Sequence, residues 1–378
     1  MSYIVEKLVY PGLGLVRKDG FVIFVRDVLP GERISLNIVR KKAHYAEGQL
    51  VEIHEPSPDR IQPRCPHFGQ CGGCQLQHAH PCIHSSLKKA WLQEVLRGRE
   101  PDDFVEASSF FEWRKKITLH VLSRQLGFFS YDNRTLVPIT CCPIFSADED
   151  LFQRFKGIAR SLPDRVDISL FRTPDLRILV SGNIDSELRN EIEALSVLGR
   201  EYQFQACGRQ WWASTDAFVQ NHPTVEAMWN DVVSYIKMKN IKRIFDLYAG
   251  VGVTAVLLAE QGICVEAIEG SKVAVQAAEK NKCENVQFYC GMVEKVLLTL
   301  KRGVDCIVVN PPRTGLSKNV RKACVEHDPT YIIYISCSPA TLARDMQSFE
   351  KWNIVSLKGY DLFPQTGHFE TVAIFEKP

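Results

Sequence analysis

The pattern of apolar and polar residues divides the 378-residue chain into three parts. The first part, residues 3–54, carries short strand-like runs at 3–9, 21–25, 33–40 and 46–53. Asp19-Gly20 marks a tight hairpin between two of the strands. These runs predict a small five-stranded β-barrel, and the proline-punctuated stretch at 55–60 predicts a linker after it.

The second part mixes two periodicities. Residues 86–97 have apolar side chains at helical spacing, and further helices are predicted at 148–161 and 186–198. Strands are predicted at 116–122, 126–131, 166–172 and 177–181. The pattern does not determine how these strands pair, so it predicts only a mixed α+β domain.

The third part alternates regularly from Pro223 onwards. Helices are predicted at 223–239, 253–261 and 272–282, and strands at 243–247, 264–268, 286–289, 305–309, 331–335, 354–361 and 370–375. Strands separated by helices predict an α/β fold with a doubly wound, Rossmann-like parallel sheet. Because a short loop joins the last two strands, we expect one of them to be antiparallel.

Composition places the chain among soluble globular proteins, with 45% hydrophobic and 24% charged residues. No apolar run reaches the roughly 18 residues that span a bilayer. The N-terminus lacks the pattern of a signal peptide, so we expect a cytoplasmic protein. The net charge of +2 leaves a nucleic-acid partner open. Thirteen cysteines in a cytoplasmic chain indicate metal, cluster or catalytic use.

Three cysteines are grouped as Cys65-x5-Cys71-x2-Cys74, and Gly72-Gly73 lets the backbone fold around a ligand. The spacing fits a structural zinc site, a redox pair at Cys71 and Cys74, or a [4Fe–4S] cluster. Spacing alone slightly favours zinc. Cys82 is the nearest candidate for a fourth ligand.

Several polar or reactive residues follow strands of the predicted parallel sheet. The glycine turn Asp246-Leu247-Tyr248-Ala249-Gly250-Val251-Gly252 follows the first strand, and Glu269 ends the second, where an acid can bind ribose hydroxyls. Asn310-Pro311-Pro312 and Cys337 follow two later strands. A lone cysteine after a strand is usually inert. Here the neighbouring motifs favour a catalytic thiol, because ligands and chemistry collect at the carboxyl ends of such strands.

Four strings resemble the family of AdoMet-dependent RNA (uracil-5-)methyltransferases. They are Ser336-Cys337-Ser338-Pro339-Ala340-Thr341, Phe363-Pro364-Gln365-Thr366-Gly367-His368-Phe369-Glu370, Asn310-Pro311-Pro312-Arg313, and Cys65…Cys71-Gly72-Gly73-Cys74. The resemblance covers nearly the whole chain. It implies a TRAM-like RNA-binding barrel at 1–55, a central iron–sulfur domain at 56–215 and a class I methyltransferase domain at 216–378. We expect the segment 77–107 to pack on the catalytic domain.

The resemblance also implies a role for each site residue. Cys337 is the expected nucleophile at carbon 6 of uracil, and Glu370 the general base that removes the carbon 5 proton. The expected AdoMet contacts are Gln220, Tyr248, Glu269 and Asn310. The expected ligands of a [4Fe–4S] cluster are Cys65, Cys71, Cys74 and Cys142, with Cys141 and Cys82 as rivals for the fourth position.

The implied substrate is RNA, with large-subunit (23S) ribosomal RNA favoured and transfer RNA as the alternative. The basic string Arg40-Lys41-Lys42, beside His44 and Tyr45, is either a solvated surface or an RNA-binding face, and the resemblance favours the face. No protein partner is expected, and the enzyme is expected to be a monomer.

Two other functions are compatible with part of the sequence. Asn310-Pro311-Pro312 is also similar to the motif of exocyclic-amino methyltransferases, but Arg313 stands where those enzymes place an aromatic residue, and they need no cysteine nucleophile. A non-catalytic iron–sulfur RNA-binding protein is the second alternative. The presence of both Cys337 and Glu370 argues against it.

Overall fold

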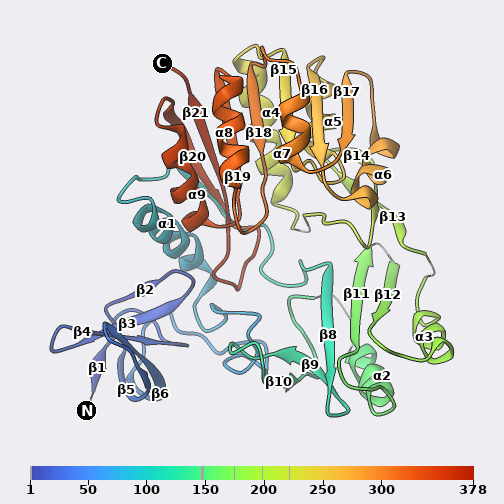
Figure 1. The fold of residues 1–378 in the computed structure, drawn as a ribbon. Coiled ribbons are helices and arrows are strands. Elements are labelled where there is room, and N and C mark those ends of the chain that lie inside the picture. Colours follow the sequence, from blue (N-terminus) through green and yellow to red (C-terminus); the bar gives the residue numbers. More distant parts are fainter. Residues whose placement is uncertain (1, 146–148, 174, 198, 221) are drawn as a thin grey trace.

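A computed structural model describes residues 2–145, 149–173, 175–197, 199–220 and 222–378 of the chain. Figure 1 shows three parts: a small barrel at the lower left, a mixed module at the lower right, and a large sheet flanked by helices at the top. Within the described ranges, no helix is long and apolar enough to cross a membrane.

The N-terminal barrel is built from β1 (Tyr3–Ile4), β2 (Lys7–Val9), β3 (Leu13–Lys18), β4 (Phe21–Val25), β5 (Arg33–Lys41) and β6 (Tyr45–Glu55). Their order is β1-β5-β6-β4-β3-β2. Strands β1 and β2 were predicted as one strand, residues 3–9. These two halves stand at the opposite ends of the strand order, so the sheet closes into the predicted five-stranded barrel. Asp19 and Gly20 form the predicted hairpin at φ 50° and 81°. The pattern missed β3, whose alternation Gly14 interrupts.

The central module contains one antiparallel sheet of order β10-β9-β8-β11-β12. Its strands are β8 (Lys116–Leu122), β9 (Gln125–Phe129), β10 (Leu136–Pro138), β11 (Asp167–Thr173) and β12 (Asp175–Ser181). Helices α2 (Glu149–Ala159) and α3 (Ser186–Glu193) pack against it. All four predicted strands are present, and only the short β10 was missed. Two predicted helix ends, Asp148 and Leu198, lie outside the described residues.

A short hairpin connects the central module to the C-terminal domain. Its strands, β13 (Glu201–Ala206) and β14 (Arg209–Ser214), pair only with each other. The Asn281 side chain accepts a hydrogen bond from the Trp212 amide at 2.7 Å and donates one to the Trp212 carbonyl at 2.9 Å. This contact attaches the hairpin to helix α6 (Lys272–Asn281).

The largest described sheet has eight strands in the order β17-β16-β15-β18-β19-β21-β20-β7. They are β15 (Arg243–Leu247), β16 (Cys264–Glu269), β17 (Val286–Cys290), β18 (Cys306–Val309), β19 (Tyr331–Ser336), β20 (Asn353–Tyr360), β21 (Glu370–Glu376) and β7 (Asp103–Val105). Strand β21 is antiparallel to both of its neighbours, as predicted for one of the last two strands. Strand β7 comes from the N-terminal half of the chain and pairs with β20 at the sheet edge.

Helices cover both faces of this sheet (Figure 1). One face packs against α4 (Val225–Met238), α5 (Val253–Ala259) and α6, and the other against α1 (His84–Val95), α7 (Val293–Val296), α8 (Lys318–His327) and α9 (Pro339–Met346). Short 3-10 turns occur at Pro81–Ile83, Leu297–Thr299 and Gln347–Phe349. Because both faces are covered, the central strands are continuous apolar runs; every residue of β18 is buried.

Candidate active site

The antiparallel direction of β21 brings Cys337 and Glu370 together. In the β19–β21 ladder Ser336 lies opposite Thr371, so the next position of the same register joins Cys337 with Glu370. The parallel strands end at this edge, and β21 begins there. Strand β18 leads into Asn310-Pro311-Pro312-Arg313 at the same edge. The topology therefore gathers three of the four family strings at one place.

Glu370 is a buried carboxylate with one free oxygen. Its side chain is 2% exposed, and its Oε1 accepts a hydrogen bond from Gln220 Nε2 at 2.9 Å. Among the described residues, Oε2 has no hydrogen-bond partner. Burial raises the pKa of Glu370 to about 7, although the Gln220 hydrogen bond and the Arg313 charge oppose the rise. A carboxylate that titrates near neutral pH suits a general base.

Cys337 lies half-buried in the turn between β19 and α9. Burial raises the pKa of its thiol to about 11, the charge of Glu370 adds to the rise, and Arg313 opposes it. The Ser338 amide donates to Ser336 Oγ at 3.1 Å, and Ser338 Oγ accepts from the Thr341 amide at 3.4 Å as the N-cap of α9. These bonds fix the turn that presents the thiol.

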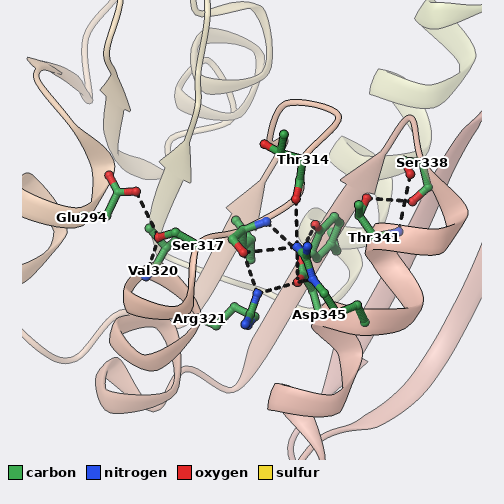
Figure 2. Close-up of polar contacts among 11 residues, drawn as sticks. Glu294, Thr314, Ser317, Val320, Arg321, Ser338, Thr341 and Asp345 are labelled. Carbon is green, nitrogen blue, oxygen red and sulfur yellow. Dashed lines mark hydrogen bonds and ion pairs between the residues drawn. The ribbon is translucent and has the colours of Figure 1, made fainter.

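Asp345 links helix α9 to the loop that contains Arg313. It is fully buried, and its Oδ2 accepts hydrogen bonds from the Leu316 amide at 2.7 Å and from the Tyr334 hydroxyl at 2.8 Å. Its Oδ1 accepts from Arg321 at 2.7 Å. Figure 2 shows Asp345 and Arg321 close to Thr314, at the centre of this network.

This network holds the Arg313 loop and the Cys337 turn as one unit. Arg344 also donates to the Thr314 carbonyl at 2.9 Å, and Ser317 caps α8 while donating to Glu294 at 3.0 Å (Figure 2). The sequence pattern did not identify this role for Asp345. Asp345 lies three residues after Leu342, on the buried face of α9. A charged residue at such a position is rarely buried without partners, and this is the signal that could have indicated the role of Asp345.

The expected AdoMet residues lie at the ends of adjacent strands. Glu269 Oε2 accepts from the Gly250 amide at 2.9 Å and Oε1 from the Ser271 amide at 2.7 Å, and both oxygens keep a lone pair for a ligand hydroxyl. Tyr248 follows β15 at φ 65°, and the Asn310 amide donates to the Leu247 carbonyl at 3.1 Å. Gln220, the fourth expected contact, donates to Glu370 Oε1.

The N-terminal barrel also reaches this site. Tyr10 is half-buried, and its ring centroid lies 6.5 Å from that of His368 in an edge-on contact. Burial raises the pKa of Tyr10, while Arg313 opposes the rise and Cys337 and Glu370 add to it, so its hydroxyl lies within electrostatic reach of all three. Tyr10 is far from these residues in sequence, so the sequence pattern did not place it at the site.

One cavity of about 890 Å³ extends from the cysteine loop to neighbours of Glu370 and Cys337, although these two residues do not line it. Its wall includes Gln220, Arg313 and His368, the basic residues Arg114, Lys115 and Lys116, and the cysteines Cys65, Cys71, Cys74, Cys141 and Cys142. Cys82 does not line it, and its sulfur lies 2.9 Å from His80 Nδ1. In the described ranges, no group of three or more His, Cys, Asp or Glu side chains is placed to hold a single metal ion.

All five of these cysteines lie close enough for the charge of one thiolate to raise the pKa of another, and Cys141 acts on Cys65. Burial raises the pKa of Cys74 and Cys142 to about 12 and also raises that of Cys65 and Cys71. Cys74 and Cys142 are each raised further by Cys65 and Cys71. Cys71 Sγ accepts from the Gly73 amide at 3.4 Å. These sulfurs match the all-sulfur donor set of an iron–sulfur cluster, to which they would bind as thiolates with the positive irons offsetting their charge.

Comparison with known proteins identifies the family. The tRNA (Uracil-5-)-methyltransferase family matches residues 184–378. An uncharacterized RNA methyltransferase of Protochlamydia amoebophila is 34% identical over 99% of this chain and 96% of its own length. The 23S rRNA (uracil(1939)-C(5))-methyltransferase RlmD of Edwardsiella ictaluri is 28% identical over 97% of this chain and 93% of its own.

A solved structure shares the fold. The crystal structure of Pyrococcus abyssi tRNA (uracil-54, C5)-methyltransferase in complex with S-adenosyl-L-homocysteine superposes with a TM-score of 0.78, over 99% of this chain and 100% of that one, at 21% identity. The α/β fold predicted for the catalytic domain is thereby confirmed. The chain belongs to the tRNA (uracil-5-)-methyltransferase family and is an AdoMet-dependent RNA (uracil-5-)methyltransferase.

Proposed function

We propose that this enzyme methylates carbon 5 of a uridine in large-subunit ribosomal RNA through a covalent bond between Cys337 and the uracil. The observation that supports this mechanism is the register that places Cys337 opposite Glu370, whose buried Oε2 has no partner among the described residues. The relative named as a 23S rRNA methyltransferase supports the choice of RNA.

The proposed chemistry follows from the weak nucleophilicity of uracil carbon 5. The Cys337 thiol first loses its proton to solvent. The thiolate then adds to carbon 6, and the electron pair of the C5–C6 double bond moves to form an enolate. Carbon 5 then bonds the methyl group, and AdoMet leaves as S-adenosylhomocysteine. Glu370 Oε2 takes the carbon 5 proton, the C5–C6 double bond re-forms, and the C6–S electron pair returns to sulfur. Arg313, which lowers the pKa of both residues, offsets the negative charge in this pocket.

Each expected AdoMet residue has a proposed task. Glu269 binds ribose hydroxyls, Tyr248 and Asn310 border the cofactor at the ends of β15 and β18, and Gln220 connects the cofactor side to the base. AdoMet supplies the methyl group when it is bound. The target uridine must be unstacked to enter this pocket, which a loop of a large RNA allows.

The substrate is tested by mass spectrometry of 5-methyluridine in ribosomal and transfer RNA from cells with and without the gene. We expect the 23S rRNA modification to disappear and that of tRNA to persist. Loss from tRNA alone would instead identify the alternative substrate, which the matched family's name contains. A new N-methylated base would identify an exocyclic-amino methyltransferase.

We propose that residues 56–215 hold a [4Fe–4S] cluster on Cys65, Cys71, Cys74 and Cys142. Anaerobically purified protein is expected to be brown and to contain iron and sulfide, because such clusters absorb broadly in the visible range. Cys142→Ser should lose the iron, because it removes a thiolate from the cavity. Cys82→Ser should keep it, because this residue lies outside the cavity.

Iron analysis and visible absorption of the purified variants decide the ligand set. Stoichiometric zinc without iron in the wild type would refute the cluster. If Cys142→Ser keeps its full iron content and Cys141→Ser loses its iron, the fourth ligand of the cluster is Cys141, which also lines the cavity.

We propose that the barrel, residues 1–55, binds RNA through a TRAM-like basic face. Arg40, Lys41 and Lys42 are exposed at the end of β5. Replacing all three by Gln should weaken RNA binding and flatten its dependence on salt, since each lost phosphate contact removes about 0.7–0.9 of a unit from the slope. The measurement is the RNA dissociation constant between low and high salt.

A matched control is the double variant Lys301→Gln, Arg302→Gln. These two exposed residues precede β18, at the amino-terminal ends of the parallel strands, whereas the candidate active site lies at their carboxyl ends. Their replacement should leave the slope unchanged. An unchanged slope in the barrel variant as well would show that its basic face is only solvated.

A further inference from the structure

The loop that leads to Glu370 is held by the segment that follows the cysteines. Both the Gln75 and the Leu76 amides donate to the Gln365 carbonyl at 3.0 Å. The Gly367 amide donates to Gln75 Oε1 at 3.0 Å. Gln75 directly follows Cys74 in the chain but lies 292 positions from Gly367.

The Gln75 side chain uses both ends of its amide. While Oε1 accepts from Gly367, Nε2 donates to the Gly72 carbonyl at 3.0 Å. Gly72 lies between Cys71 and Cys74, and its own amide donates to the Phe129 carbonyl of β9 at 3.0 Å. One side chain therefore connects the cysteine loop, which is itself attached to the central sheet, to the loop that contains the base.

The loop has little freedom to find another arrangement. Gln365 is 1% exposed and adopts φ 68°. A Cβ atom on Gly367 would lie 1.9 Å from the Pro11 carbonyl oxygen, so the barrel closes off the other side. Only two residues separate Gly367 from Glu370, and the carboxylate has no second polar contact on Oε2 among the described residues. The placement of Glu370 thus depends on how this backbone is held.

We propose that Gln75 is a positioning residue for the general base: its amide transmits the geometry of the cysteine loop to Gly367, and through it to Glu370. This inference rests on the proposed roles of Glu370 and the cysteine loop. A buried amide donor that loses its acceptor is costly, so the loop of a variant without this acceptor should open more often.

Two substitutions separate the two ends of the amide. Gln75→Met has a similar length but loses both hydrogen bonds, whereas Gln75→Glu keeps an acceptor for Gly367 and loses the donor to Gly72. Gln70→Met makes the same chemical change at an exposed position of the same loop. The first measurement is amide hydrogen exchange of residues 366–370, in protein whose iron content is determined in parallel.

We expect exchange at Gly367 to rise about ten-fold in Gln75→Met, to rise much less in Gln75→Glu, and to stay at the wild-type rate in Gln70→Met. A general collapse of the cysteine loop would raise exchange equally in both Gln75 variants, since both lose the Gly72 contact. That equality, or unchanged exchange in Gln75→Met, would overturn the proposal.

The second measurement is the fraction of RNA trapped as a covalent adduct with the enzyme. A misplaced base slows proton removal but not thiol addition, so Gln75→Met should accumulate adduct while its AdoMet dissociation constant is unchanged. If Glu370→Gln traps adduct and Gln75→Met does not, the positioning role is wrong although the proposed mechanism stands. If Glu370→Gln traps none, the mechanism fails, and the exchange rates still decide whether Gln75 holds the loop.

Discussion

Cys337→Ala is expected to abolish 5-methyluridine formation while binding of AdoMet and RNA stays close to that of the wild type. Without thiolate addition at carbon 6, carbon 5 of uracil is too weak a nucleophile to attack a methyl group. Removal of a covalent nucleophile typically costs on the order of 10⁶-fold in rate, which here means no product above background. The side chain is half-buried in a turn fixed by Ser336 and Ser338, so Ala leaves the fold intact.

The measurement uses RNA and radiolabelled AdoMet, followed by a denaturing gel. The Cys337→Ala enzyme should give neither labelled RNA nor a slowly migrating protein–RNA band. Cys264→Ala serves as the control. This exposed cysteine begins β16, so it lies at the amino-terminal ends of the parallel strands, away from Cys337 at their carboxyl ends. Methylation by Cys337→Ala would refute thiol addition in this protein.

The parts of the fold that follow from long periodic segments were predictable. Strands β4, β8 and β15 match their predicted bounds, since each is an apolar run bounded by turn residues or charges. Strands β7, β10, β13 and β14 were missed. The first two have three residues each, and β7 pairs with β20, which lies far away in the sequence. Strands β13 and β14 form a local hairpin, so a local signal for them existed and was overlooked. The helix α7 was missed because it has only four residues, and α8 because most of its residues are polar or charged.

The candidate site was predictable as a list of residues but not as an arrangement. One of the last two strands was expected to be antiparallel, but the sequence pattern did not say which one. The antiparallel direction of β21 is what places Glu370 beside Cys337, the residue that follows β19. The contacts that hold this edge were hidden, because each joins residues far apart in sequence. Examples are the bond from Gly367 to Gln75 and the approach of Tyr10 to His368. Such contacts are set by how whole domains pack, which periodicity does not encode.

Glu370→Gln is expected to attack and methylate RNA and then stall as a covalent adduct. A general base typically contributes about 10²–10⁴-fold, or about 3–5 kcal/mol of barrier, so release of the thiol becomes the slow step. Gln keeps the shape of the pocket, and its carbonyl still accepts from Gln220. The substitution also removes the negative charge that raises the pKa of Cys337, so more thiolate is available for the first attack.

The denaturing gel should therefore show a strong protein–RNA band for Glu370→Gln. Glu376→Gln is the matched control at the other end of β21, where the carboxylate bonds Lys239 and Tyr331 far from the thiol. Turnover of Glu370→Gln at the wild-type rate would place the base elsewhere.

The pH dependence of the wild type gives an independent test of the same carboxylate. Burial raises the pKa of Glu370 to about 7, so below that pH the carboxyl group is protonated and cannot take the carbon 5 proton. Single-turnover release of methylated RNA should therefore increase as the pH rises through about 7, and the adduct should accumulate on the acid side. Because Gln does not titrate, the Glu370→Gln enzyme should lose this dependence of the release step, whereas Glu376→Gln should retain it. A release rate that depends on pH in the same way in Glu370→Gln would assign the titration to a different group.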